Sequence, residues 1–256
     1  MIAKIRSHIT KLLRDAVLLR AELPEVLEIT PFQDRSPRDY GDLDQDGRYV
    51  LFEDAFRGAP SEIAVRQSRY LPWIREGVSA SGGLPVLDAG FGRGEFLRAL
   101  RDEGIVVRGV DLNASSCASL IDEGFDVTCR DVNAYLKDCQ EAEYSAVVSN
   151  SVIEHMEPDD ALEFLRLATR AVAPGGCVVV ETNNPECAFA LGQFWLDPTH
   201  TRPYHALTVT FHLRSCGCSR ATVTYACPVS RAHRVPGTHP CNYQEYAAVG
   251  FKEGVG

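Results

Sequence analysis

The sequence predicts an α/β fold, a doubly wound and mostly parallel β-sheet with helices on both faces. From residue 84 onward, short apolar runs of strand length alternate with longer runs that have helical periodicity. Glycines end several of the helical runs, and a cluster of glycines follows the first apolar run. Short strands that alternate with helices are typical of βαβ units, in which crossover helices cover a parallel sheet.

The predicted elements follow one another in a regular order. Strands are expected over residues 85–89, 105–110, 125–129, 144–149 and 177–181. Helices are expected between them, over residues 95–103, 114–123, 133–138 and 158–172. Residues 206–215 fit either a helix or a strand. Residues 221–227 and 245–251 both predict strands, which would close the sheet as an antiparallel pair.

The part of the chain before residue 84 lacks this alternation. We therefore divide the chain into a helical extension and lid at residues 1–83 and a main domain at residues 84–256. The pattern of residues 2–28 predicts an amphipathic helix. This helix would pack on its own protein or on a second copy of it. The alternative is that it docks on a membrane surface or on a partner protein. The remaining segments are predicted as a loop at 30–48, helical structure at 49–75 and a small, flexible connection at 77–83.

Composition restricts the class of protein. The formal net charge of −9 argues against a nucleic-acid partner, because lysine and arginine carry most phosphate contacts. The nine cysteines are odd in number and several lie in apolar runs, which favours free thiols in a reducing compartment. Cys216 and Cys218 lack the spacing of a zinc site, so we predict no metal centre. No segment has the uninterrupted apolar core of a signal peptide or a membrane span.

The strongest functional signal is a glycine cluster directly after the first predicted strand. Asp88 ends that strand, and Gly90, Gly92 and Gly94 follow at every second position. Glycines allow a backbone to approach a ligand closely at the carboxyl edge of a parallel sheet. The spacing differs from the G-x-G-x-x-G fingerprint of dinucleotide sites, and an acid at this point suits a cationic ligand better than a diphosphate.

Two further acids follow the next two predicted strands. Asp111, with Leu112 beside it, is placed to accept hydrogen bonds from both hydroxyls of a ribose. Asp131 could accept a bond from an adenine amino group while Val132 packs on the ring. Each acid has an alternative role as the N-cap of the helix that follows, and Asn113 competes with Asp111 for the first of these caps.

The order of these motifs, from about residue 84 to 252, resembles class I S-adenosylmethionine (SAM)-dependent methyltransferases. The resemblance implies a Rossmann-like sheet of seven strands in the order 3-2-1-4-5-7-6, with SAM as cofactor and S-adenosylhomocysteine (SAH) as product. It implies that Asp88 and the glycines of the first loop, together with Asp111 and Asp131, bind the cofactor. Gln67 and Ser149 complete the predicted cofactor site.

Glu154 and His155 follow the fourth predicted strand, where this class places the transferred methyl group. A similar Glu-His pair occupies this place in many small-molecule methyltransferases of the class. His155 could remove a proton from a hydroxyl acceptor, and a structural histidine is an equal alternative. Two segments, 49–72 and 194–203, resemble bacterial methyltransferases of O-antigen and related surface-glycan assembly, similar to O-antigen chain terminators.

Those two segments supply the candidate acceptor site. Arg57, Arg66 and Arg202 could hold phosphate or another anion, and Trp195 offers an aromatic face to a sugar ring. Asp197 is a further candidate, and His200 could orient or deprotonate the acceptor. Turn formation and helix capping are the alternative for Asp197, and core packing is the alternative for Trp195.

These observations predict a methyltransferase that modifies a sugar or sugar-phosphate of a bacterial surface glycan. The alternatives are a methyltransferase of a small metabolite or quinone precursor, and a non-catalytic SAM-fold partner in a glycan-assembly complex. A nicotinamide oxidoreductase is disfavoured by the glycine spacing. We expect a cytoplasmic location. If the N-terminal helix docks on a membrane surface, the protein would lie at the periphery of the inner membrane.

Overall fold

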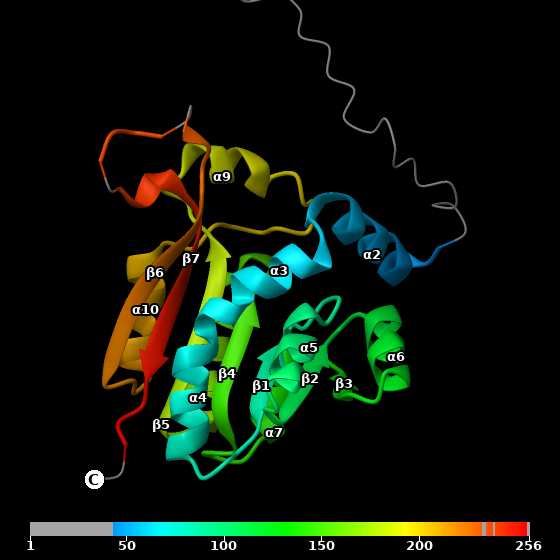
Figure 1. Ribbon diagram of the computed structural model, residues 1–256, viewed down its shortest axis with the longest axis vertical. Coiled ribbons are helices and arrows are strands. Elements are labelled where there is room, and N and C mark those ends of the chain that lie inside the picture. The colour runs from blue at the N-terminus through cyan, green and yellow to red at the C-terminus, as the bar shows by residue number, and fades with distance from the viewer. Residues whose placement is uncertain (1–42, 232–233, 238, 255–256) are drawn as a thin grey trace, which may run out of the picture. The chain divides into compact units, whose positions relative to one another are not determined.

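The computed structural model describes residues 43–231, 234–237 and 239–254, so the predicted helix at 2–28 lies outside the described residues. The described chain forms one seven-stranded sheet in the order β3-β2-β1-β4-β5-β7-β6 (Figure 1). Six of its strands share one direction, and β7 runs antiparallel to both of its neighbours. The strands are β1 (Val86–Ala89), β2 (Val107–Asp111), β3 (Asp126–Cys129), β4 (Tyr144–Asn150), β5 (Val172–Asn183), β6 (Arg220–Pro228) and β7 (Tyr243–Phe251). The predicted fold class and strand order are confirmed.

Helices cover both faces of the sheet. The described α-helices are α2 (Gln45–Phe56), α3 (Pro60–Gln67), α4 (Leu71–Ala80), α5 (Glu95–Asp102), α6 (Ala114–Asp122), α7 (Val132–Asp138), α8 (Pro158–Ala171), α9 (Ala188–Phe194) and α10 (Ala206–Ser215). The segment 206–215, which fitted either state, is helical, and α9 was not expected. On one face α4 packs on β4 and β5, whereas α8 and α10 cover the opposite face (Figure 1).

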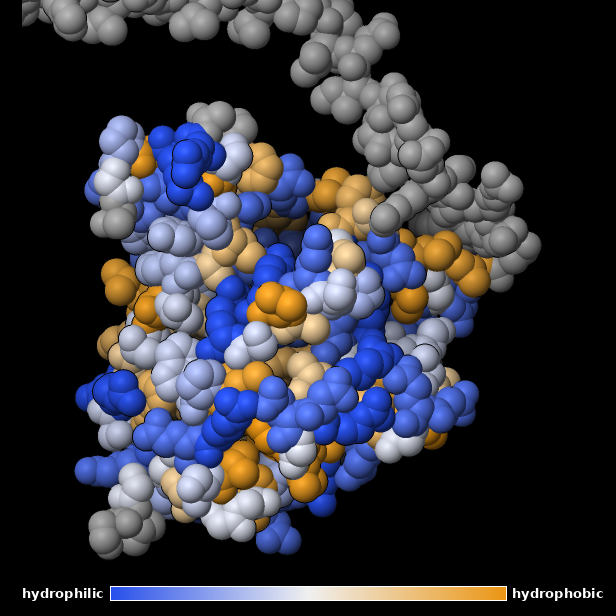
Figure 2. Space-filling view, viewed as in Figure 1, coloured by the Kyte–Doolittle hydropathy of each residue, from blue (hydrophilic) through white to orange (hydrophobic). Residues whose placement is uncertain are grey.

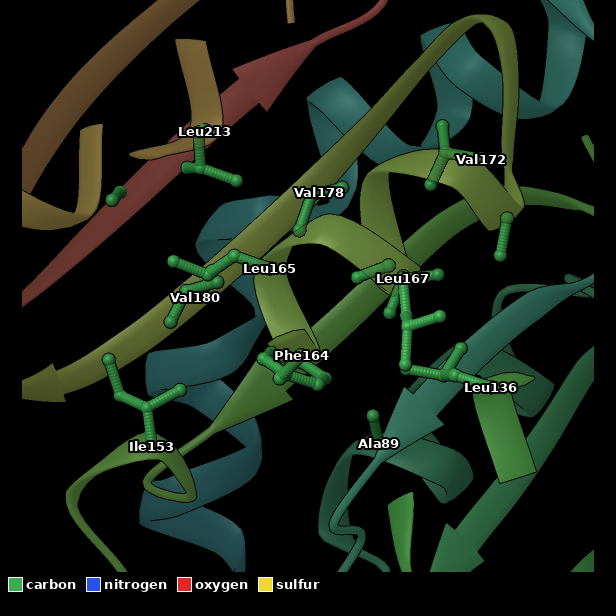
Figure 3. Packing of buried hydrophobic residues seen from close by; sticks show 14 of the residues in the cluster. Ala89, Leu136, Ile153, Phe164, Leu165, Leu167, Val172, Val178, Val180 and Leu213 are labelled. Carbon is green, nitrogen blue, oxygen red and sulfur yellow. The ribbon is translucent and has the colours of Figure 1, made fainter. Parts of the chain in front are cut away.

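Successive side chains of the central strands belong to two hydrophobic cores, one on each face of the sheet. On β4, Val147 belongs to the core beneath α8 and α10, and Val148 belongs to the core beneath α4 and α5. Figure 3 shows Phe164 and Leu165 of α8 beside Val180 of β5 in the first of these cores. Both faces of the strand are therefore apolar, as is typical of a parallel sheet covered on both sides. Burial of each large apolar side chain contributes roughly 1.5–3 kcal/mol.

Three predicted boundaries are wrong, one because of a local cap and two because of contacts with a distant part of the chain. α2 begins at Gln45, inside the predicted loop 30–48, because the Asp44 carboxylate caps it by accepting a 2.8 Å bond from the Gly47 backbone N–H. α4 continues to Ala80, through most of the predicted flexible connection. Its Gly77 serves close packing, since a Cβ there would lie 2.8 Å from the backbone oxygen of Ser145.

The third wrong boundary is the start of β5. The run Pro174-Gly175-Gly176 was expected to separate a helix from a strand that begins at residue 177. Instead β5 starts at Val172, which pairs with Tyr144, and a register irregularity lets the strand pass through this run. A Cβ on Gly176 would lie 2.2 Å from the Ser145 carbonyl oxygen, so this glycine is required by close strand contact.

The parallel strands β1, β2, β4 and β5 end at one edge of the sheet, above which α2, α3 and α9 lie (Figure 1). The order reverses between β1 and β4, which makes this edge the expected ligand-binding crevice. On the face that carries α3 and α4, polar residues surround smaller apolar patches (Figure 2). Among the described helices, none combines the length and hydrophobicity needed to cross a bilayer.

Candidate active site

The glycine loop between β1 and α5 leaves no room for a side chain at two of its positions, Gly90 and Gly94. Gly90 and Gly94 have φ angles of 82° and 79°, in the left-handed region that glycine adopts without strain. A Cβ on Gly90 would lie 2.3 Å from a Val152 methyl carbon, and one on Gly94 would lie 2.7 Å from a Leu120 methyl carbon. Close packing from both sides thus requires a bare backbone at this edge.

Asp111 at the end of β2 turns its carboxylate toward this loop. Oδ2 accepts a 2.9 Å hydrogen bond from the Gly92 N–H, and Oδ1 accepts a 2.8 Å bond from the Asn113 N–H. Asn113, not Asp111, caps α6, because its side chain accepts a 2.9 Å bond from the Ser116 N–H. The carboxylate of Asp111 is therefore placed beside the glycine backbone, as the predicted ribose role requires. Leu112 is 66% exposed next to it.

Asp131 after β3 does cap its helix. Its Oδ1 accepts a 2.8 Å bond from the Ala134 N–H at the start of α7. The side chain is exposed, and the neighbouring Val132 is buried. Capping uses one carboxylate oxygen, so the cap and the predicted adenine contact are compatible roles for this residue.

Buried polar groups without hydrogen-bond partners gather around the ends of β1 and β4. They include both carboxylate oxygens of Asp88, the hydroxyl of Ser149 and the amide group of Asn150. Gln67, at the end of α3, contributes a further buried oxygen without a partner. Each such group costs about 1–3 kcal/mol unless a ligand or water satisfies it. The sequence had predicted three of these residues as cofactor contacts, and it missed Asn150.

Burial raises the pKa of Asp88 to about 8, and the nearby carboxylates of Asp111 and Glu95 add to the rise. Arg57 acts in the opposite direction. A buried carboxyl group of this kind gains from a cation that enters its site, because the cation stabilises the ionised form.

The pKa of Asp88 leads to a testable pH dependence. Below about pH 8 this carboxyl group is protonated in the free protein, and a cationic ligand that favours its ionised form must displace the proton. The affinity for SAM should therefore rise with pH, by up to about tenfold per pH unit between about pH 6 and 8. Calorimetric titration measures this slope. Asp88→Asn should flatten it, and an unchanged slope in that variant would exclude Asp88 as its source.

Two of the three arginines predicted to hold an anion, Arg57 and Arg66, already have carboxylate partners. Arg57 donates a 2.8 Å bond to Glu53 of α2, a residue buried beside Gly92 of the glycine loop. Arg66 pairs with Glu245 at 3.0 Å, and Arg69 pairs with the buried Glu181. These pairs reduce the positive charge available to a phosphate. Arg202, in contrast, is exposed, with its guanidinium 5.5 Å from the centre of the Tyr204 ring.

Glu154 is fully buried on the one-turn helix η3 (Ile153–His155) that follows β4. Its Oε2 accepts a 2.8 Å bond from the Thr182 hydroxyl, and its Oε1 has no partner among the described residues. Burial raises the pKa of this carboxyl group to about 7. The backbone oxygen of Glu154 accepts a 2.8 Å bond from the Thr201 N–H, which ties the segment 197–202 to the end of β4.

His155 belongs to a chain of hydrogen bonds that determines its tautomer. The Thr199 hydroxyl lies 2.6 Å from Asp197 Oδ1 and 2.9 Å from His155 Nδ1. Because an ionised carboxylate only accepts, the hydroxyl donates to Asp197 and accepts from His155 Nδ1–H. The Nε2 lone pair of His155 is therefore free to act. Burial, and then the adjacent His200, lower the pKa of His155 to about 4.

Two neighbours complete this arrangement. The Tyr49 hydroxyl of α2 donates a 3.1 Å bond to Asp197 Oδ2. His200 donates from Nδ1 to the Phe194 carbonyl oxygen at 2.7 Å, and its Nε2 lies 3.8 Å from Asp197 Oδ2, too far for a hydrogen bond. Burial lowers the pKa of His200. The ring centres of His155 and His200 are 4.6 Å apart. The turn that was expected as the alternative role of Asp197 is present, because Asp197 Oδ1 also accepts a hydrogen bond from the Thr199 N–H.

Sequence reasoning had placed both histidines in one site but overlooked Tyr49 and Thr199 as their supports. Thr199 lies inside the Asp-Pro-Thr-His run, which was its only signal. Trp195, the predicted sugar platform, is 63% exposed and packs edge-on against Phe194, whose ring in turn lies 4.4 Å from that of His200. Core packing is thus excluded for Trp195.

Comparisons with solved structures agree with this fold. A SAM-dependent methyltransferase from Archaeoglobus fulgidus has a similar structure, with a TM-score of 0.72 and 27% sequence identity, over 80% of this chain and 99% of that one. A SAM-dependent methyltransferase from Mesorhizobium loti shares the fold at a TM-score of 0.53 and 18% identity, over 75% of this chain and 98% of that one. The fold and the glycine-lined edge define a class I methyltransferase that uses SAM as its cofactor.

Sequence comparison identifies the family. Residues 45–219 match the methyltransferase domain family, and the chain belongs to it. Over 120 residues the chain is 33% identical to the ubiquinone biosynthesis O-methyltransferase of Leptothrix cholodnii. That alignment covers 44% of this chain and 50% of the relative, so the chain spans about half the length of this curated protein.

Proposed function

We propose that this methyltransferase transfers its methyl group to a hydroxyl oxygen, and that a sugar of a surface glycan carries this hydroxyl. The observation that carries the proposal is the histidine pair, whose Nδ1 atoms are engaged by Thr199 and Phe194. The Nε2 lone pairs of His155 and His200 are then available to an acceptor. A neutral hydroxyl needs such a group, whereas a phosphate is already anionic and would call for unpaired arginines.

The chemistry is a displacement at the methyl carbon. The acceptor oxygen attacks in line with the bond between methyl carbon and sulfur, that bond breaks, and the electron pair remains on sulfur as SAH forms. The proton of the hydroxyl passes to an imidazole Nε2. The sulfonium loses its positive charge in this step. Because the sulfonium donor is already activated, orientation of the reactants and exclusion of water supply much of the acceleration.

The proposed cofactor contacts follow from the geometry of the edge. Asp111 and Leu112 would receive the ribose, Asp131 and Val132 the adenine, and Asp88 the charged amino-acid end of SAM. Gln67 and Ser149 offer buried oxygens without partners near this end. Their support is the gathering of these groups around a loop in which Gly90 and Gly94 leave no room for a Cβ.

We also propose that α2 and α3 form the described part of a lid over this site. The Asp46 carboxylate of α2 accepts a 2.8 Å bond from the Ala114 N–H, and its backbone oxygen accepts a 3.1 Å bond from the Asn113 side chain. Arg93 of the glycine loop donates to Asp54 at 2.9 Å. These contacts hold α2 against the loop and the start of α6.

A sugar acceptor is supported by the exposed Trp195 close to the histidine pair, since aromatic faces suit the apolar face of a sugar ring. Arg202 and Asp197 would contact its polar groups. A phenolic hydroxyl of a quinone precursor is the second candidate, and it is favoured by the O-methyltransferase named above, which shares 33% identity over 120 residues. The nine free cysteines support a cytoplasmic location.

An acceptor panel tests the proposal. The full chain is incubated with SAM and either nucleotide sugars, surface-glycan oligosaccharides, sugar phosphates or catechols, and SAH release and methylated product are measured by mass spectrometry. We expect product from a glycan hydroxyl. Transfer to catechols alone would support the second candidate. Methylation of a phosphate oxygen would contradict a hydroxyl acceptor.

Thr199→Val should lower kcat by roughly 10- to 100-fold with little change in the KM for SAM, because general acid–base catalysis of this size depends on correct orientation of the imidazole. The substitution removes the hydroxyl that holds His155 Nδ1 while it keeps the side-chain volume. Thr210→Val is the matched control, since the Thr210 hydroxyl bonds only to backbone oxygens within α10. Equal rates for the two variants would show that this hydrogen-bond chain does not matter for transfer.

A further inference from the structure

We propose that Glu154, His155 and His200 bind a divalent transition-metal ion such as Zn²⁺. Each residue offers one potential ligand atom, and these three atoms all lie within 4.8 Å of one another. Ligands about 2.0–2.1 Å from a tetrahedral Zn²⁺ are separated from one another by roughly 3.4 Å, so a small closure of side chains would complete the set. The sequence had not predicted this site, because His200 is 45 residues beyond His155.

Hydrogen bonds already prepare both imidazoles as ligands. Metal-binding histidines usually donate their second ring N–H to a backbone oxygen or a polar side chain, which fixes the tautomer and the ring orientation. His200 donates from Nδ1 to the Phe194 carbonyl oxygen at 2.7 Å, and His155 donates from Nδ1 to the Thr199 hydroxyl at 2.9 Å. The Nε2 atoms of both rings are the ones left free for a cation.

Glu154 supplies the third donor. It is fully buried, and its Oε1 has no hydrogen-bond partner among the described residues, while Oε2 is held by Thr182 at 2.8 Å. A carboxylate oxygen buried without a partner is costly, and a cation removes that cost. A shared dication satisfies all three groups.

The donor set indicates the kind of metal. Two histidines and one glutamate are a ligand set of catalytic Zn²⁺ sites, in which a fourth position stays open for water or substrate. Imidazole donors suit Zn²⁺, Fe²⁺ and Co²⁺ better than Mg²⁺ or Ca²⁺, which prefer oxygen donors alone.

The consequence for catalysis rests on the proposed function. A hydroxyl oxygen that takes the open position releases its proton to solvent more readily, since a metal ion lowers the pKa of an oxygen bound to it. In the metal-bound form the histidines act as ligands and the proton leaves to solvent, whereas in the metal-free form an imidazole Nε2 accepts it; the acceptor is a hydroxyl in both. The methyl group still moves from sulfur to this oxygen with the same breaking and forming of bonds.

Titration of the full, chelator-treated chain with Co²⁺, followed by visible absorption, tests the site, and calorimetry with Zn²⁺ measures its affinity. We expect one equivalent of metal bound through nitrogen and oxygen donors. His200→Gln and Glu154→Gln should weaken binding at least about tenfold. His212→Gln, which alters a histidine of α10 outside the cluster, is the matched control and should bind normally. SAH affinity verifies that each variant is folded.

Several results would overturn the metal site. An intense near-ultraviolet thiolate band would show that cysteines bind the Co²⁺ instead, and unchanged affinity in both His200→Gln and Glu154→Gln would exclude the cluster. Methyl transfer at full rate by protein that binds no metal would overturn the metal proposal and leave the hydroxyl acceptor intact. Metal binding that depends on the cluster, without transfer to any hydroxyl, would support the site and contradict the proposed function.

Discussion

Gly90→Ala should reduce the free energy of unfolding by about 3 kcal/mol and weaken SAH binding at least tenfold, because backbone strain and overpacking each cost about 1–3 kcal/mol. The φ angle of 82° is unfavourable for alanine, and the new Cβ would lie 2.3 Å from a Val152 methyl carbon. Relief of this contact must displace either the glycine loop or the segment that follows β4. Either movement alters the surface that SAM is expected to contact.

Gly104→Ala separates these two effects. Gly104 also has a positive φ angle, 71°, but a Cβ there would meet nothing within 4 Å. Its substitution should cost only about 1 kcal/mol of backbone strain and leave SAH affinity unchanged. Urea unfolding and calorimetric titration of both variants measure the difference. If Gly90→Ala were no more harmful than Gly104→Ala, close packing at the loop would not be what requires glycine.

Asp111→Ala should weaken SAH binding roughly 100-fold, since hydrogen bonds to a charged group contribute about 1.5–3 kcal/mol each and this carboxylate is proposed to accept bonds from the ribose hydroxyls. The substitution also frees the Gly92 N–H, which now donates to Asp111 at 2.9 Å. Part of the loss would therefore come from a less ordered loop. Asp111→Asn, which keeps one acceptor oxygen, should lose less.

Asp126→Ala is the control for charge. Asp126 is exposed on β3, where it pairs with Arg108 at 3.1 Å, and its removal changes the net charge by the same amount. Calorimetry should show unchanged SAH affinity for this variant. Equal affinities of Asp111→Ala and the native chain would remove Asp111 from the cofactor site.

Local pattern alone was enough to predict most of the sheet. The apolar runs that became β1, β2, β4 and β7 are short and bounded by glycines or polar residues. Such runs are typical of strands that are buried on both faces, so their secondary structure could be predicted. The strand order, however, came from resemblance to a family, because pairing joins segments far apart in the chain. Boundaries failed where a distant contact decides them, as at Gly77 and Gly176, which both lie against the backbone of Ser145.

The residues proposed to bind the cofactor could be named from the sequence because their positions follow directly from the order of strands and loops. An acid at the end of each of the first strands and glycines after β1 reach one edge in any parallel sheet of this order. The acceptor site was not predictable in this way. Arg57 was expected to bind an anion, yet at the end of α2 it pairs with Glu53, four residues before it.

The sequence by itself thus determined the fold class, the loop that approaches SAM and the segments that contain both histidines. Only the tertiary structure decided what those histidines can do. It brought Thr199 to His155 and the Phe194 carbonyl to His200, and it buried Glu154 with one oxygen unsatisfied. The reason is physical, because tautomer, charge state and ligand geometry depend on the partners within a few ångströms, and a linear pattern does not specify those partners.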